Sequence, residues 1–307
     1  MKKFFLAAML VVFTVAATGA NAASDPKYKP FVLASKAAGD KAATVADVSA
    51  KLKSAGLDIV GTHSPYPSTT ILVVTNDAMK MAAAKSKHGG FGAAQRVSIT
   101  EHNGEVQVAY TNPRYMAGSY RMNTDLGFAA DTMEKALGKV EEYGMKSGMD
   151  DDDLRDYHYM MGMEYFTDPH YLSRYKNYND AIAAVEKGLA AGTMGVSKVY
   201  RIDLPGKDES LFGVALNGAS DAVGQANDAY LMSEIDFKDV RSSAHLPYEI
   251  LVAGKKVYSL SARFRIAQSF PDLSMMGDNS FMNIMDSPND IKAALKAVAG
   301  DHWEKLD

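Results

Sequence analysis

The chain has 307 residues, with 33 basic and 37 acidic side chains and a formal net charge of −4. Apolar residues make up 47% and charged residues 23%, the proportions of an ordinary soluble globular protein, which excludes a disordered or collagen-like chain. Because there is no cysteine, disulfides, thiolate metal sites and cysteine nucleophiles are excluded. No basic excess is present to neutralise phosphates, so nucleic acid is not an expected partner.

The first 22 residues predict a cleaved signal peptide. Lys2 and Lys3 precede an apolar stretch from Phe4 to Ala17, and Ala20-Asn21-Ala22 has the small residues of a cleavage site. This stretch of about 14 residues is shorter than the roughly 20 that span a bilayer, which argues against a membrane anchor. We therefore expect an exported, periplasmic protein with no membrane insertion after cleavage.

Residues 23–138 predict a first α+β unit. Residues 96–100 and 106–110 alternate in polarity on either side of Asn103-Gly104, which predicts a hairpin with a type I′ turn. Apolar periodicity and runs indicate the other elements. The expected helices cover residues 42–55, 77–87 and 126–137, and the expected strands cover 57–62 and 70–74.

Residues 179–307 predict the same order of elements again. Asn179 is the expected N-cap of a helix that ends at Gly192, a weaker helix ends near Met232, and Ser287-Pro288 begins the last helix. The expected strands cover residues 196–202, 211–216, 246–252 and 256–264. The repeated order favours a tandem duplication. We expect an α+β fold of two related units, each a mainly antiparallel sheet with helices on one face, joined by a helical connector over 139–178.

Parts of both halves resemble the DUF302 family of domains of unknown function. The ending Tyr110-Thr111-Asn112-Pro113 fits the family pattern, whereas Thr75-Asn76-Asp77 stands where the family has a fuller turn. The other similar segments are 55–60, 71–74, 96–110 and, in the second half, 245–252. The resemblance implies a small α+β fold and association of units, and it implies no particular activity.

The connector has the most unusual composition of the chain. On a helix, His158 and Met161 would share one face, and thioethers with imidazole suit Cu(I) in a protein without cysteine. The opposing interpretation is that methionines and tyrosines at helical spacing pack a core or an interface. The candidate metal ligands are His158, Met160, Met161, Met163 and His170.

A second methionine-rich segment covers residues 270–285. Its mixture of large apolar residues with glycine and polar residues indicates a loop that lies against the other unit or covers a pocket. Arg114 and Arg265 follow the two hairpins, either as an anion clamp or as outward members of an alternating pattern. The candidate ligand-binding residues are Tyr157, Tyr165, Met275, Met276, Arg114 and Arg265.

The sequence contains no recognisable catalytic motif, and the run Asp150–Asp153 is typical of a helix start. The leading interpretation is a non-catalytic binding protein that holds copper or a small apolar molecule between the two units. The first alternative is a structural protein whose methionine-rich surfaces form a homo-oligomer. The second is an enzyme acting on a small periplasmic substrate.

Overall fold

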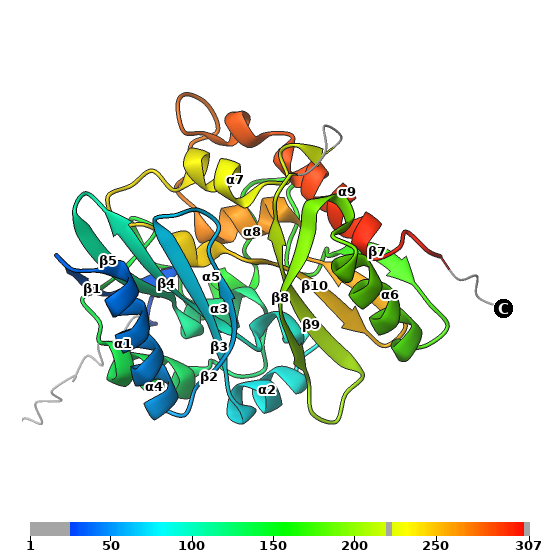
Figure 1. Cartoon of the computed structure of the whole chain (residues 1–307), viewed down its shortest axis with the longest axis horizontal. Coiled ribbons are helices and arrows are strands. Elements are labelled where there is room, and N and C mark those ends of the chain that lie inside the picture. The colour runs from blue at the N-terminus through cyan, green and yellow to red at the C-terminus, as the bar shows by residue number, and fades with distance from the viewer. Residues whose placement is uncertain (1–24, 219–222, 304–307) are drawn as a thin grey trace, which may run out of the picture.

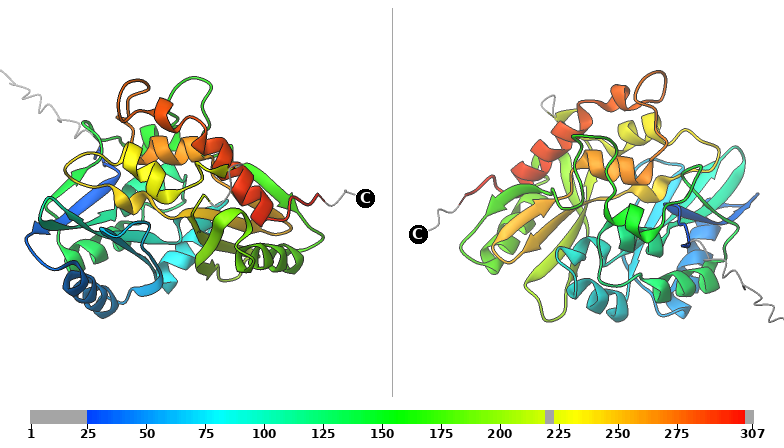
Figure 2. Two further views of the ribbon diagram at one scale, coloured as in Figure 1. Left: turned by 45° about the horizontal axis from the view of Figure 1, so that its top comes forward. Right: turned by 180° about the vertical axis from the view of Figure 1, so that it is seen from behind.

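The computed structural model of the chain describes residues 25–218 and 223–303. Over these residues the chain forms two antiparallel sheets that lie side by side, with helices packed on them and across their junction (Figure 1, Figure 2). The predicted signal peptide, residues 1–22, lies outside the described residues. Within them, no helix combines the length and the apolar character needed to cross a membrane.

The first half of the chain builds a sheet of six strands in the order β2-β3-β4-β5-β1-β6, with every neighbouring pair antiparallel. The strands are β1 (Phe31–Ala37), β2 (Asp58–His63), β3 (Thr69–Thr75), β4 (Gln95–His102), β5 (Glu105–Thr111) and β6 (Glu141–Tyr143). The helices of this half are α1 (Lys41–Ser54), α2 (Asp77–Ala84), α3 (Pro113–Ser119) and α4 (Gly127–Leu137).

The second half builds a sheet of five strands in the order β7-β11-β10-β9-β8, again antiparallel throughout. The strands are β7 (His170–Arg174), β8 (Val196–Asp203), β9 (Glu209–Leu216), β10 (Tyr248–Ala253) and β11 (Lys256–Ser259). The helices are α6 (Tyr178–Ala190), α7 (Asp228–Ile235), α8 (Ala262–Ser269) and α9 (Ser287–Val298). Short 3₁₀ turns are η1 (Gly89–Gly92), η2 (Thr193–Gly195), η4 (Ser243–His245) and η5 (Phe281–Ile284).

The two halves share one topology. The first runs β1-α1-β2-β3-α2-β4-β5-α3-α4, and the second runs β7-α6-β8-β9-α7-β10-β11-α8-α9. Replacing each strand by its counterpart turns the order β2-β3-β4-β5-β1 into β8-β9-β10-β11-β7, which is the order of the second sheet. The expected α+β fold with antiparallel sheets is therefore confirmed, and the shared strand order is compatible with the expected two-unit arrangement.

Local sequence chemistry sets several boundaries of these elements. Asn112 accepts a hydrogen bond from the backbone N–H of Arg114 at 3.2 Å, and Pro113 occupies the first turn of α3. Asn103 and Gly104 have φ values of 52° and 78°, so both positions of the β4–β5 turn have the positive φ that a type I′ turn requires. The predicted hairpin is thus observed at its predicted turn.

Other boundaries differ from the prediction. Each unit begins with a strand, β1 or β7, that the sequence patterns did not reveal. The N-cap of α6 is Asn177 and not Asn179, because the Asn177 side chain accepts from the Asp180 N–H at 3.0 Å. The predicted strand over 256–264 ends at Ser259, and its last residues begin α8.

The ends of the connector join the two sheets as β6 and β7, and between these strands it is mostly irregular, with one short helix, α5 (Asp151–Arg155). Asp150 caps this helix by accepting from the Asp153 N–H at 3.0 Å, the role expected for the aspartate run. The predicted helix through His158 and Met163 is absent. Gly162 has φ of 86°, a left-handed conformation that is incompatible with a continuous helix, so the helical spacing of this run does not apply.

The edge strands of the two sheets meet at the junction of the units. β2 and β8 each carry a bulge, between Ile59 and Gly61 and between Lys198 and Tyr200. A Cβ at Gly61 would lie 2.9 Å from the Tyr200 Cβ, so only glycine permits this approach. Each edge thereby covers the other.

The apolar cores of the two units also join. The core of the first unit includes buried second-unit side chains from β8, β9, β10 and α8. These side chains are Tyr200, Ile202, Leu211, Leu251 and Phe264. Because the shared core holds both units in a fixed arrangement, polar groups on the facing surfaces of the units are also held in fixed positions.

Candidate functional site

A polar pocket of about 350 Å³ lies between the two units. Its first-unit wall comes from the loop before β3 and the end of β4, and its second-unit wall from α7 and the loop after it. The walls consist of Tyr66, Ser68, Thr100, Glu101 and His102 on one side and Ala229, Met232, Ser233, Asp236 and Arg241 on the other. Because charged and hydrogen-bonding groups from both units converge here, this inter-unit pocket is the candidate site.

A chain of hydrogen bonds links the two walls. The Ser243 hydroxyl donates to Asp236 Oδ2 at 2.9 Å, and the Tyr66 hydroxyl lies 2.9 Å from the same serine oxygen. Since the serine hydrogen is used on the carboxylate, Tyr66 donates to Ser243. The backbone N–H of Ser242 donates to Asp236 Oδ1 at 2.7 Å. The chain therefore runs from a first-unit phenol to a second-unit carboxylate.

Burial changes the titration of the groups at both ends of this chain. Asp236 is only 5% exposed, and its burial raises the pKa of the carboxyl group to about 6, against the opposing effect of its hydrogen bonds. Burial, and then the nearby Asp236 charge, raise the pKa of Tyr66. Near neutral pH this series of hydrogen bonds therefore has the neutral phenol of Tyr66 at one end and, at the other, the carboxylate of Asp236 close to its titration range.

Arg241 supplies a positive charge to the pocket, and the first unit fixes its backbone. Its N–H donates to Gln107 Oε1 at 2.9 Å, and its carbonyl accepts from the Tyr143 hydroxyl at 2.6 Å. Its guanidinium donates to the carbonyl of Asp236 and lies 3.2 Å from His102 Nδ1. Burial and then this guanidinium lower the pKa of His102, which keeps the imidazole neutral at pH 7.

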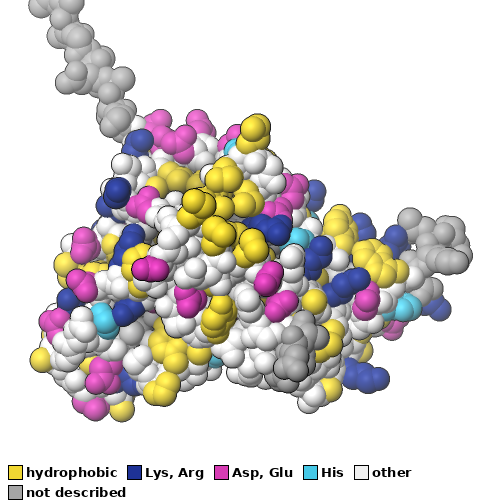
Figure 3. Space-filling model, turned by 90° about the horizontal axis from the view of Figure 1, so that it is seen from above, with side chains coloured by type: hydrophobic (Ala, Val, Ile, Leu, Met, Phe, Trp, Pro, Cys, Tyr) yellow, Lys and Arg dark blue, Asp and Glu magenta, His cyan; other side chains and the backbone are white. Residues whose placement is uncertain are grey.

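The predicted metal-binding methionines lie at different depths along the connector. Met161 is 95% exposed, Met160 is 43% exposed, and Met163 is half-buried. The exposed methionines of the connector and of the C-terminal loop (residues 270–286) are Met160, Met161, Met276, Met282 and Met285. Hydrophobic side chains gather on the upper face of the molecule (Figure 3).

The two predicted histidine ligands have other contacts. The His158 ring packs on Tyr165 with centroids 4.3 Å apart, and its Nδ1 lies 3.4 Å from the Asp156 carbonyl. His170 begins β7 and is half-buried, which lowers its pKa. Among the residues that the structure describes, no group of three or more His, Cys, Asp or Glu side chains is placed to hold a metal ion.

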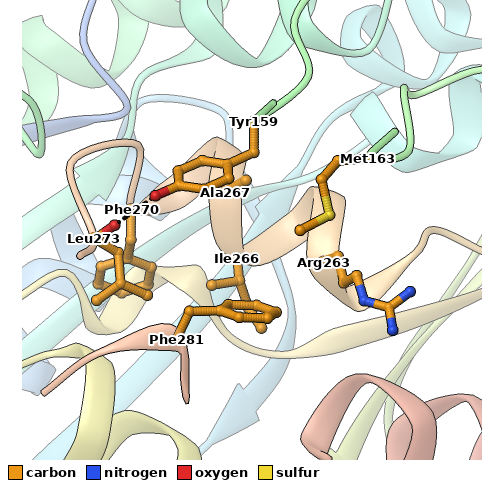
Figure 4. A pocket seen from close by; sticks show the side chains of 8 residues that line it. All are labelled: Tyr159, Met163, Arg263, Ile266, Ala267, Phe270, Leu273 and Phe281. Carbon is orange, nitrogen blue, oxygen red and sulfur yellow. Dashed lines mark hydrogen bonds between the residues drawn. The ribbon is translucent and has the colours of Figure 1, made fainter. Parts of the chain in front are cut away.

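Met163 reaches a small apolar notch on α8, where the connector and the C-terminal loop meet (Figure 4). Tyr159 stands beside it and donates from its hydroxyl to the Leu273 carbonyl at 2.9 Å, while Phe281 lies on the opposite wall. The notch has a volume of about 20 Å³, room for about one water molecule. In this conformation it cannot enclose the small apolar ligand expected from the sequence.

The two predicted arginine clamps are engaged elsewhere. Arg114 pairs with Asp125 at 2.7 Å and Asp131 at 3.2 Å near the surface. Arg265 is 2% exposed, donates to Glu249 and is thus sealed inside the junction. Of the two arginines that follow the hairpins, one therefore forms surface ion pairs and the other belongs to a buried cluster, and they do not face a common ligand site.

The remaining predicted ligand-binding residues lie along the connector and the C-terminal loop. Tyr157 is half-buried and donates to the Ala267 carbonyl at 2.9 Å, and burial raises its pKa. The Tyr165 ring packs at a tilt against the His158 ring. Met275 is half-buried and Met276 is 70% exposed. None of the residues predicted to bind a ligand or a metal lines the inter-unit pocket.

Sequence patterns missed the pocket because its residues are far apart in the chain. His102 precedes the turn of a hairpin, where the sequence suggests only a solvated side chain, and Arg241 belongs to no motif. The available signal was the loop Ser64–Ser68, which is rich in turn residues and supplies Tyr66 and Ser68. Nothing in that loop indicates which part of the second unit it contacts.

Residues 28–141 match the family model described as Domain of unknown function DUF302. The match covers the first unit almost entirely and leaves the second unit outside it. Comparison with curated proteins and with solved structures gave no significant match.

Proposed function

We propose that this protein is an exported, periplasmic, non-catalytic binding protein that holds a small polar molecule in the inter-unit pocket. The carrying observation is the pocket itself, because both units supply its walls and about 350 Å³ lies within the usual size range of small-molecule sites. The fixed backbone of Arg241 and the bonded pair Ser243–Asp236 mean that the site is organised before any ligand arrives.

Binding is favoured over catalysis by the position of the nucleophile-like group. Ser243 is fully buried, and its hydroxyl is used between Tyr66 and Asp236, so it cannot reach a bound molecule. The groups that do face the pocket are hydrogen-bond donors and acceptors and a guanidinium. The shared topology of the units supports the further proposal that they descend from one duplicated DUF302-like unit.

The test is native mass spectrometry on protein purified from its natural host, with the variant Ser68→Trp, which places a large ring at the pocket rim. We expect the unmodified protein to carry a small polar compound and the variant to lose it. The control is Ser54→Trp, an equal change at an exposed residue that does not line the pocket and that ends α1, whereas Lys41 at the other end of this helix bonds to the 64–68 loop. Retention of the same compound by the Ser68→Trp variant would contradict the proposal.

Copper binding is a second candidate, favoured by the exposed methionines. Met161 at 95% and Met276 at 70% exposure present thioether sulfurs that a Cu(I) ion can approach. We expect titration with Cu(I) to show binding that falls at least tenfold when Met160, Met161 and Met163 are changed to leucine. Leucine preserves volume and polarity, so equal binding by the variant removes the copper candidate. Self-association without copper, lost in the same variant, would instead favour the homo-oligomer.

A further inference from the structure

We propose that the ligand of the inter-unit pocket is a small monocarboxylate that also carries a hydroxyl or amino group, and that Arg241 is the partner of its carboxylate. The inference rests on the proposed function and names the chemical class that this site selects. Three observations carry it: an arginine with no carboxylate of the described residues within 4.0 Å, a negative charge on the opposite wall, and the size of the pocket.

The guanidinium of Arg241 has N–H donors that the protein itself does not use. In the part of the chain that the structure describes, no carboxylate oxygen lies within 4.0 Å of its guanidinium. Two of its contacts are to neutral groups, the Asp236 carbonyl and the His102 ring. A guanidinium has five N–H donors in a planar fork, so about three remain for a ligand, and that fork matches a carboxylate.

The position of this guanidinium is set by the docking of the units. Gln107 bonds to the backbone of the loop after α7 at two places. Its Oε1 accepts from Arg241 N at 2.9 Å, and its Nε2 donates to the Asp239 carbonyl at 2.7 Å. Tyr143 holds the Arg241 carbonyl from the other side. Two first-unit strands, β5 and β6, therefore hold the backbone of this second-unit arginine at the pocket wall before binding.

The charges of the pocket limit the ligand to one negative charge. Glu101, on the first-unit wall, is an exposed carboxylate, and Asp236 adds a second carboxylate deeper in the second-unit wall. These two groups repel a dianion or a phosphate, whereas one carboxylate is compensated by Arg241. Glu101 also accepts hydrogen bonds, so it suits a hydroxyl or amino group at the other end of the ligand.

The hydroxyl groups of the walls complete this recognition. Ser233 already donates to the Tyr230 carbonyl at 2.7 Å, so its oxygen is left to accept, and Ser68 stands opposite on the first-unit wall. Met232 and Ala229 supply the apolar surface for a short carbon chain. The site therefore combines a guanidinium, carboxylates, hydroxyl groups and a short apolar surface, which are the groups that match a hydroxy or amino acid.

The experiment is isothermal titration of the full mature chain with L-lactate and L-serine, alongside glycerol, inorganic phosphate and putrescine. We expect lactate or serine to bind, and the three other probes to bind at least tenfold more weakly. Arg241→Gln should weaken binding about ten- to hundredfold, as expected for loss of a charge-assisted hydrogen-bonded pair. Arg241→Lys should restore part of it. The matched control is Arg114→Gln, which removes an arginine that pairs with Asp125 and Asp131.

Ser68→Trp keeps the charge of Arg241 and should abolish binding, so it tests the site even if Arg241→Gln does not fold. Tightest binding of glycerol, phosphate or putrescine, or equal binding by Arg241→Gln, would overturn the inference. If no probe binds while a native compound is retained and is lost in Ser68→Trp, the ligand class is wrong and the proposed function stands. If that compound survives Ser68→Trp, both are wrong.

Discussion

Two arginines of the second unit meet the first unit in opposite ways. Arg265 is 2% exposed and donates to Glu249, which also accepts from the first-unit Arg96 and from the Tyr200 hydroxyl at 3.1 Å. Arg241 lies half-buried at an open pocket, and its guanidinium contacts are to a carbonyl and a neutral ring. The sealed arginine can only hold the units together, whereas the open one remains available to a ligand.

The sealed cluster has more positive than negative charge. Arg96 and Arg265 share the single carboxylate of Glu249, and the Nε atoms of both arginines are buried without a hydrogen-bond partner. Both guanidinium groups have lost their contact with water, so their stability depends on that one acidic group. This dependence is what distinguishes the cluster from the pocket, where water or a ligand can reach the cation.

The largest expected effect follows from removing that carboxylate. Glu249→Gln keeps the shape of the side chain and leaves two buried positive charges uncompensated, which should lower the free energy of unfolding by about 3–5 kcal/mol. Urea denaturation at pH 7 measures it. Glu186→Gln is the matched control, because Glu186 pairs with Lys198 and Arg201 near the surface, and its loss should cost less than about 1 kcal/mol. Equal costs for the two variants would remove the distinction between sealed and open charges.

A smaller effect is expected from the pH dependence of the pocket. The pKa of Asp236 is about 6 in the folded protein, against 3.8 as its ordinary value, so the folded state binds this proton more tightly. Stability should therefore rise as the pH falls from 7 through 6 and level off below about 4, by up to about 3 kcal/mol. Urea denaturation across this range, compared with Asp236→Asn, isolates the contribution.

The comparison variant is needed because another buried carboxyl, Asp228, also has a raised pKa. In Asp236→Asn the contribution of Asp236 disappears and that of Asp228 remains, so the difference between the two pH profiles belongs to Asp236. Parallel profiles would show that the Asp236 carboxylate is as well solvated as an exposed one, and the pocket would then not differ from ordinary surface.

Sequence patterns predicted local elements well where one strong signal set a boundary. The turn at Asn103-Gly104 and the helix start at Ser287-Pro288 are observed as expected. Strands β1 and β7 were missed because each pairs with a distant strand, β5 or β11, and sequence-local patterning does not reveal that pairing. The first residues of α8 were assigned to a strand because they continue the apolar alternation of β11.

The candidate site was not predictable for a related reason. Arg114 and Arg265 follow equivalent hairpins, yet one is paired at the surface and the other is buried, which only the packing of the units decides. Arg241 has no local pattern around it, and its role depends on Gln107 and Tyr143 of the other unit. A site whose residues come from both units has no characteristic residue spacing in the sequence.

The meeting of β2 with β8 has a consequence for any protein that has only one such unit. Here the edge strand of each sheet is covered by the corresponding edge strand of the other sheet, at a contact so close that Gly61 cannot carry a side chain. A single unit would leave that edge strand exposed, and a separate molecule would be needed to cover it. This chain closes both edges inside one polypeptide, because β2 of one unit and β8 of the other meet there.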